Sequence, residues 1–138
     1  KPIRMTPLYV TLHRWAAEPF VWGLSDCMTA IADWVLEMDG FDPCADLRGT
    51  YGNPETCPLG RRYRHEVADL CAERFSPLER VGTAGPGDIA LLQLPGHPYL
   101  SGALRLHGRE WAMKSEERGV LTTRFGKPRA IWKTGYAS

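Results

Sequence analysis

One hydrophobic stripe dominates the first half of the chain. Counted from Cys27, apolar residues follow at offsets of 3, 4, 7, 8 and 11, which is the spacing of a buried helix face. Ser25 or Asp26 can cap the start of this helix, and Gly40 can end it. Because the stripe is almost unbroken, the pattern predicts a central helix that packs against the rest of the core.

Two further helices are predicted on either side of the central one. Residues 6–17 open with a Thr-Pro pair, which suits the cap and the first position of a helix. Residues 61–75 return to helical spacing, with arginines on the opposite face. Between these helices, residues 42–51 are predicted as a short helical turn followed by a bend, and residues 52–58 as an exposed loop rich in proline and glycine.

The second half of the chain has the pattern of short strands. A Pro-Gly-Asp turn at residues 86–88 leads into a continuous apolar run, and the following run alternates between leucine and smaller or polar residues. His107 and Gly108 can turn that second strand back into a third. The predicted strands are residues 89–94, 100–106, 110–113 and 129–134.

The order of helices followed by strands predicts a segregated α+β fold, with N-terminal helices and the central helix packed on a small antiparallel sheet of about four to six strands. The length of 138 residues fits a single domain with one core. We expect that domain to cover residues 1–138, with a first helix in 1–19, a helical half in 20–76 and the sheet in 77–138.

Composition and charge exclude several classes of protein. Hydrophobic residues make up 43% of the chain and charged residues 24%, and 17 Lys+Arg stand against 16 Asp+Glu. This balance argues against a disordered chain, a nucleic-acid-binding protein and a polybasic membrane anchor. No apolar run approaches the roughly 18 residues of a membrane span, and the first residues lack the apolar stretch of a signal peptide.

The spacing of the four cysteines does not indicate a metal site. Cys27, Cys44, Cys57 and Cys71 contain no close pair of the kind that zinc sites use. We therefore expect reduced thiols, with neither a metal nor a cofactor. The alternative is a four-cysteine metal or iron–sulfur site, which requires at least three of these thiols to converge.

Cys27 is the candidate nucleophile of this sequence. It stands at the first turn of the central helix, where unpaired backbone amides and the helix dipole favour a negative charge. Such a position lowers the pKa of a thiol and makes it more nucleophilic. The competing interpretation is a small buried side chain within the apolar stripe.

Two segments carry a resemblance to a known family. Phe20-Val21-Trp22-Gly23-Leu24-Ser25-Asp26-Cys27 and Pro86-Gly87-Asp88-Ile89-Ala90-Leu91-Leu92 resemble the hallmark segments of NlpC-type cysteine peptidases, which are papain-like enzymes that cleave peptidoglycan stem peptides. In that family the cysteine begins the central helix, and the Gly-Asp turn opens the first strand of the sheet. Residues 42–51 are similar to a compact branch encoded in the tail modules of tailed phages and gene-transfer particles. The resemblance extends over residues 20–132.

The sequence departs from the family at the catalytic base. Active members have a histidine at the start of the next strand, and Ser101 stands in its place. Serine cannot accept the thiol proton as a base. His97, four residues upstream in a loop, is the candidate substitute, whereas His107 lies too far along the strand. The strand that usually supplies the orienting residue offers no convincing one among residues 111–115.

The resemblance implies a phage tail-tip or baseplate component, made in the host cytoplasm and carried in the virion. The preferred interpretation is a structural protein whose peptidase activity is degraded, held by other tail proteins. The alternative is an active endopeptidase that cleaves peptidoglycan to aid genome entry. In it, Cys27 attacks a stem-peptide carbonyl, His97 takes the proton, and amides at the helix start stabilise the oxyanion. Neither version involves nucleic acid or a membrane span.

Overall fold

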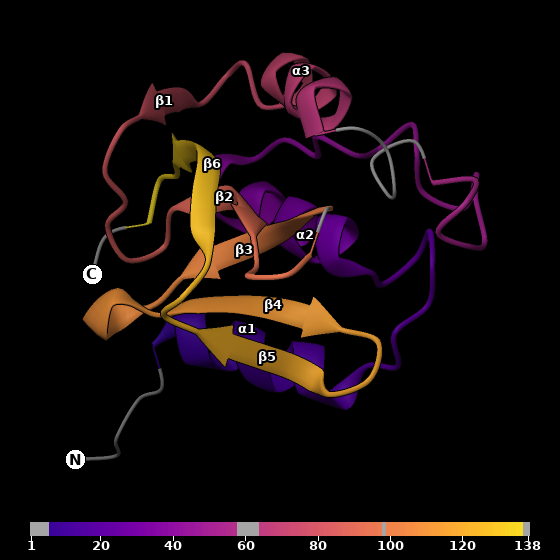
Figure 1. Cartoon of the computed structure of the whole chain (residues 1–138), viewed down its shortest axis with the longest axis horizontal. Coiled ribbons are helices and arrows are strands. Elements are labelled where there is room, and N and C mark those ends of the chain that lie inside the picture. Colours follow the sequence, from indigo (N-terminus) through magenta and orange to yellow (C-terminus); the bar gives the residue numbers. More distant parts are fainter. Residues whose placement is uncertain (1–5, 58–63, 98, 137–138) are drawn as a thin grey trace.

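The computed structural model describes residues 6–57, 64–97 and 99–136, with three α-helices and one six-stranded sheet (Figure 1). The predicted α+β class, with helices first and strands second, is confirmed. None of the helices described is long and apolar enough to cross a lipid bilayer. The helices are α1 (Pro7–Ala17), α2 (Cys27–Asp39) and α3 (Arg64–Arg74). The strands are β1 (Glu79–Val81), β2 (Ile89–Gln93), β3 (Leu100–Arg105), β4 (Trp111–Ser115), β5 (Gly119–Thr123) and β6 (Lys127–Lys133), with a short 3₁₀ turn, η1 (His107–Arg109), before β4.

The strands lie in the order β1-β6-β2-β3-β4-β5, and every neighbouring pair is antiparallel. Helix α2 packs against β3 and β4, and α1 packs against β4 and β5. Figure 1 shows both helices behind the strands, so they cover the same face of the sheet. Helix α3 lies near β6, where the rings of Phe75 and Trp132 are 4.9 Å apart. This arrangement places the first residue of α2 against the middle of the sheet.

Helix α2 is the central helix that the apolar stripe predicts. Its N-cap is Asp26, whose side chain accepts the amides of Met28 and Thr29, while the Thr29 hydroxyl accepts the Asp26 amide in return. Gly40 ends the helix with a left-handed φ of 80°. Trp34 is fully buried, and its indole Nε1 donates to the Gly87 carbonyl at 2.8 Å, which ties the helix to the turn before β2.

The Pro-Gly-Asp turn joins the start of β2 to the end of β6. The Asp88 carboxylate accepts the amide of Gly85 at 2.8 Å and the amide of Thr134 at 3.2 Å. Gly87 has a φ of +86°, and a Cβ there would lie 2.4 Å from the Tyr136 side chain. Only glycine fits this position, because both the backbone conformation and the space exclude a side chain.

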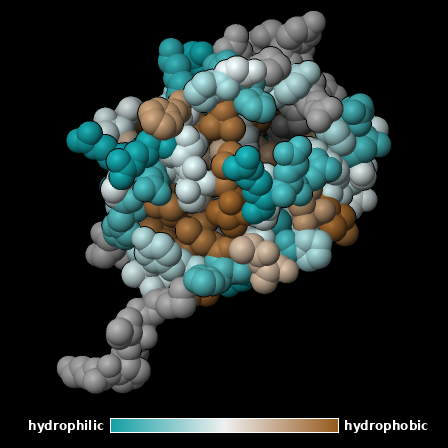
Figure 2. All heavy atoms as spheres, turned by 60° about the horizontal axis from the view of Figure 1, so that its bottom comes forward, coloured by the Kyte–Doolittle hydropathy of each residue, from teal (hydrophilic) through white to brown (hydrophobic). Residues whose placement is uncertain are grey.

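The sheet buries side chains on both of its faces. The face opposite the helices carries a second hydrophobic cluster, with partly buried neighbours from β1, β5 and the loops. A β-bulge between Leu91 and Leu92 interrupts the pairing of β2 with β6 and favours a bend in the sheet. Figure 2 shows that hydrophobic side chains also reach the surface, in a patch surrounded by hydrophilic groups. The residues of the second cluster are Ala90, Leu92, Ala103, Trp111, Met113 and Ile131.

Two elements differ from the sequence predictions. Strands β1 and β5 were not predicted, because Glu79–Val81 is only three residues long and Gly119–Thr123 shows neither strict alternation nor a continuous apolar run. Each forms through pairing with a longer strand: β1 pairs with β6, and all five residues of β5 pair with β4. Residues 42–51 agree with their prediction: the Arg48 amide donates to the Cys44 carbonyl at 3.2 Å, as in one turn of a helix, and Gly49 follows with a left-handed φ of 74°. Arg48 holds this segment through bonds to Asp42 and Asp33, at 2.7 Å each.

The predicted boundaries of the other elements agree within about two residues. Of the predicted helix 61–75, residues 61–63 lie outside the described residues, as does Pro58 of the predicted loop. The observed part of that helix is α3, which begins at Arg64.

Candidate active site

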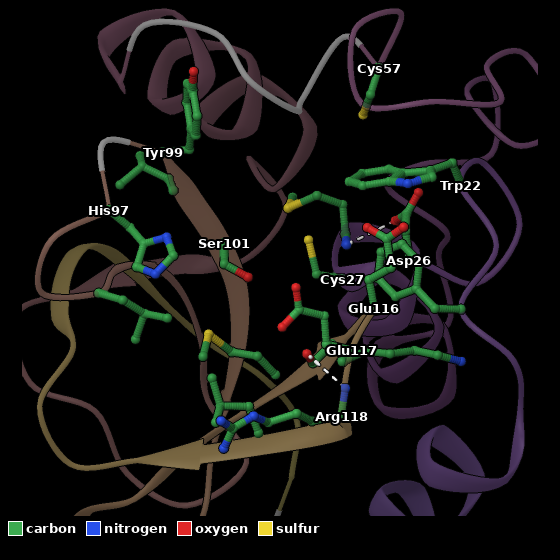
Figure 3. A pocket seen from close by; sticks show the side chains of 18 residues that line it. Trp22, Asp26, Cys27, Cys57, His97, Tyr99, Ser101, Glu116, Glu117 and Arg118 are labelled. Carbon is green, nitrogen blue, oxygen red and sulfur yellow. Dashed lines mark hydrogen bonds between the residues drawn. The ribbon is translucent and has the colours of Figure 1, made fainter.

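Cys27 occupies the first position of α2 and lines a pocket of about 570 Å³ at the edge of the sheet where β2 and β4 end (Figure 3). Aromatic rings form much of its wall. Phe20 and Trp22 meet edge to face with ring centroids 5.0 Å apart, and Tyr99 comes from the other side, before β3. A volume of this size is typical of small-ligand and peptide sites. The candidate nucleophile therefore lies at the start of the helix and faces a cavity.

The loop before Cys27 is held in one conformation by its own backbone. Val21 and Ser25 form a two-residue bridge, with amide–carbonyl distances of 3.2 and 2.8 Å. Gly23 turns this loop with a φ of +85°, and a Cβ there would lie 2.2 Å from the Tyr51 carbonyl oxygen. Position 23 therefore requires glycine. This close contact with Tyr51 explains the glycine in the segment 20–27, one of the two that carry the family resemblance.

Asp26 is the buried polar centre of the site. Its Oδ1 accepts the amides of Met28 and Thr29 at 3.0 and 2.9 Å. Its Oδ2 accepts the Gly23 amide at 2.9 Å and the Tyr51 hydroxyl at 2.5 Å. All four bonds are buried, so the carboxylate is fully satisfied. Because the amides of Met28 and Thr29 are used by Asp26, these two donors are not available to stabilise an oxyanion.

Ser101 lies next to Cys27 in the pocket (Figure 3). Its side chain and the backbone of Gly102 act on the thiol as hydrogen-bonding groups that lower its pKa, and the Ser101 hydroxyl donates to the Gly102 carbonyl at 3.4 Å. Strand β3 comes close to the helix start because residue 102 is glycine: a Cβ there would lie 2.8 Å from the Cys27 carbonyl oxygen. The residue that the resemblance aligns with the catalytic histidine thus lies beside the candidate nucleophile, and it is a serine.

The electrostatics of the site keep Cys27 protonated. Burial, followed by the negative charge of Asp26, raises the pKa of this thiol from its ordinary value of 9.0 to about 11. The hydrogen bonds from Ser101 and Gly102 lower the pKa, but by less. The expectation that the helix start lowers the pKa is therefore wrong. The dipole effect is outweighed because the cap is itself an anion and the sulfur is poorly hydrated.

His97 lines the same pocket as Cys27, on the loop between β2 and β3. Its side chain is exposed, and its amide donates to the Leu94 carbonyl at 3.1 Å. In the view of Figure 3, Ser101 lies between His97 and Cys27. After burial, the groups with the largest effects on the pKa of the Cys27 thiol are Asp26, Ser101, Gly102 and Cys57. Cys27 and His97 therefore line the same pocket, and Ser101 lies between them in this view.

Several residues of the pocket were missed by sequence reasoning. Glu116, Glu117 and Arg118 enter it from the hairpin between β4 and β5 (Figure 3). Tyr51 reaches it through Asp26 from the turns after α2. The hairpin residues look like ordinary charged surface in the sequence, and only the pairing of β4 with β5 brings them to the pocket. The helix start at Asp26 and Cys27 gives no signal for Tyr51, which lies 25 residues from Asp26 in the sequence.

The cysteines do not assemble into a ligand set. Cys44, Cys57 and Cys71 are buried, and Cys27 is half-buried. Within the ranges 6–57, 64–97 and 99–136, no three His, Cys, Asp or Glu side chains are arranged to hold a metal ion. The geometry of the described residues therefore does not support the four-cysteine metal or iron–sulfur alternative.

The buried thiols predict a loss of stability at alkaline pH. Burial raises the pKa of Cys27 to about 11 and that of Cys44 to about 12, and it also raises the pKa values of Cys71 and Tyr51. The folded protein keeps these protons while the unfolded chain loses them, so stability is complete below about pH 9 and falls between about pH 9 and 12. The urea midpoint, followed by tryptophan fluorescence, should decrease over this range. Cys44→Ala should make the decrease shallower, and a midpoint constant to pH 11 would contradict the assignment.

The fold and the site define a class: an α+β protein with a cysteine at the start of its central helix, facing a pocket against an antiparallel sheet. Residues 4–134 match a family model described as Domain of unknown function (DUF6950), and the chain belongs to that family. Searches of curated proteins and of solved structures returned no significant match.

Proposed function

We propose that this protein is a structural component of a phage tail tip, built on a papain-like, NlpC-type peptidase fold whose catalysis has been lost. The helix-start cysteine, the Gly-Asp turn before β2 and the antiparallel sheet support the fold assignment. The observation that carries the loss of catalysis is the position of Ser101 beside Cys27 in the pocket, where the resemblance expects the histidine. The base position is occupied by a group that cannot hold a proton from the thiol.

The charge around Cys27 supports the same proposal. A cysteine peptidase needs a thiolate, which an adjacent imidazolium stabilises. Here the neighbouring charge is the carboxylate of Asp26, and the pKa of about 11 leaves roughly one thiol in 10⁴ ionised at pH 7. Exposed apolar side chains, among them Leu24 and Phe125, offer contacts to neighbouring proteins.

One observation favours the alternative of an active peptidoglycan endopeptidase. His97 lines the same pocket as Cys27 and lies on a loop, so its imidazole can change position without disturbing a strand. In this alternative, a rearranged His97 takes the proton of Cys27 when a stem peptide binds.

Two measurements on the wild-type protein separate these functions. We expect no loss of turbidity in a murein suspension, and alkylation of Cys27 by iodoacetamide at pH 7 about 100-fold slower than that of an ordinary exposed thiol. Peptide mass spectrometry assigns the label to Cys27. Clearing of murein that disappears in both Cys27→Ser and His97→Ala would overturn the proposal and establish the enzyme.

A further inference from the structure

Phe125 is the most exposed large hydrophobic side chain in the described part of the protein. It is 81% exposed and stands in the loop between β5 and β6. Burying such a ring is worth about 1.5–3 kcal/mol. A single exposed apolar residue is common on protein surfaces and does not by itself indicate a binding site. The backbone around Phe125 and the charges beside it are the evidence that it contacts a partner.

The backbone around Phe125 is held in place. The Phe125 amide donates to the Thr123 hydroxyl at 3.0 Å. Gly126 lies directly on the sheet, because a Cβ there would be 2.4 Å from the Leu92 side chain. A ring on a fixed loop loses little conformational entropy when it is buried by a partner. This loop therefore presents a preorganised apolar anchor.

Positive charges stand on both sides of the anchor. Arg124 precedes Phe125 and Lys127 follows Gly126, and both side chains are exposed. Arg124 faces Glu110 at 3.6 Å, a weak surface pair that a partner carboxylate can replace. We call residues 124–127 the Phe125 knob: one aromatic ring between two cations.

The pocket at Cys27 has the complementary composition. Its wall carries the rings of Phe20, Trp22 and Tyr99, which suit edge-to-face contact with another ring. The exposed carboxylates of Glu116 and Glu117 stand at its hairpin side. Lys114, Arg118 and Asp26 also line the pocket, so the lining carries three negative charges and two positive charges, and the balance favours a cationic segment.

We infer that the Phe125 knob of one copy inserts into the Cys27 pocket of a second copy. This inference rests on the proposed structural role, and it names the partner that fills the unused pocket. The knob and the pocket share no residue, so one copy can insert its knob into a neighbour while its own pocket receives the knob of that copy or of another. Such an interface closes into a ring or extends into a fibre.

Sedimentation velocity over a concentration series tests the inference on the whole chain. The wild-type protein should form oligomers, whereas Phe125→Ser and the double variant Glu116→Lys/Glu117→Lys should each remain monomeric. An equimolar mixture of these two variants should form a dimer and nothing larger, because one supplies only the knob and the other only the pocket. Leu36→Ser, which removes another exposed apolar side chain, should still form the wild-type oligomers.

A wild-type protein that remains monomeric up to about 1 mM would overturn the inference, since the contact would then be too weak to operate. A mixture of the two variants that stays monomeric would also overturn it. Circular dichroism confirms that each variant is folded. The proposed loss of catalysis is measured separately, by Cys27 alkylation and murein clearing, so the two proposals can fail independently.

Discussion

Replacing Ser101 by histidine is expected to increase the rate of Cys27 alkylation at pH 7 by roughly 100-fold or more. Ser101 already lies beside Cys27 and acts on the pKa of its thiol, and the pocket of about 570 Å³ leaves room for an imidazole. An imidazole at this position can take the thiol proton and stabilise the thiolate as an ion pair. The rate of iodoacetamide labelling between pH 5 and 10 measures this change, and its midpoint should fall well below the wild-type pKa of about 11.

Ser101→Ala is the matched control for this substitution. The serine hydrogen bond lowers the pKa of Cys27, so its removal should raise the pKa further and slow labelling. The two variants are thus expected to change the rate in opposite directions. Equal rates for wild type and Ser101→His would show that position 101 is not a possible base position and would remove the main support for a peptidase ancestry.

Asp26→Ala is expected to lower the free energy of unfolding by about 3 kcal/mol or more, a large part of the 5–15 kcal/mol typical of a domain. Alanine leaves the amides of Gly23, Met28 and Thr29 and the hydroxyl of Tyr51 without their buried acceptor. It also removes the cap of α2. Urea unfolding, followed by tryptophan fluorescence, measures the loss.

Two milder variants separate the parts of this effect. Tyr51→Phe removes one bond to a charged acceptor and should cost about 1.5–3 kcal/mol. Asp26→Asn keeps an oxygen for the helix amides and removes the negative charge, so the pKa of Cys27 should fall and labelling should become faster. An Asp26→Ala protein as stable as the wild type would refute the role of Asp26 as the buried centre of the site.

The helices and most strands could be predicted because their signals are local. Helix α2 has an apolar stripe from Cys27, a capping residue at Asp26 and a glycine at position 40, and all three agree. Strand β5 carries no comparable pattern, because Gly119–Thr123 is half-buried along most of its length and depends on its pairing with β4. Residues 42–51 form the turn that their sequence predicts, and only the bond from Arg48 to Asp33 on α2 depends on the tertiary structure.

The candidate site also has features that the sequence predicts and features that it does not. The sequence identified Cys27 at the helix start, Ser101 in place of the histidine and His97 as the nearest substitute, and the structure brings these three residues to one pocket. The sign of the pKa shift could not be predicted. It depends on how deeply the sulfur is buried and on a carboxylate whose charge acts through a poorly hydrated space.

What the sequence determined by itself is the order and type of the main elements and the position of the thiol at the start of α2, since helix periodicity, capping and turn residues act over a few neighbours. Only the tertiary structure decided the state of that thiol and the composition of its pocket. Tyr51, Ser101 and Glu117 reach the site from separate segments, and the desolvation and charge that hold Cys27 protonated arise only when those segments pack together.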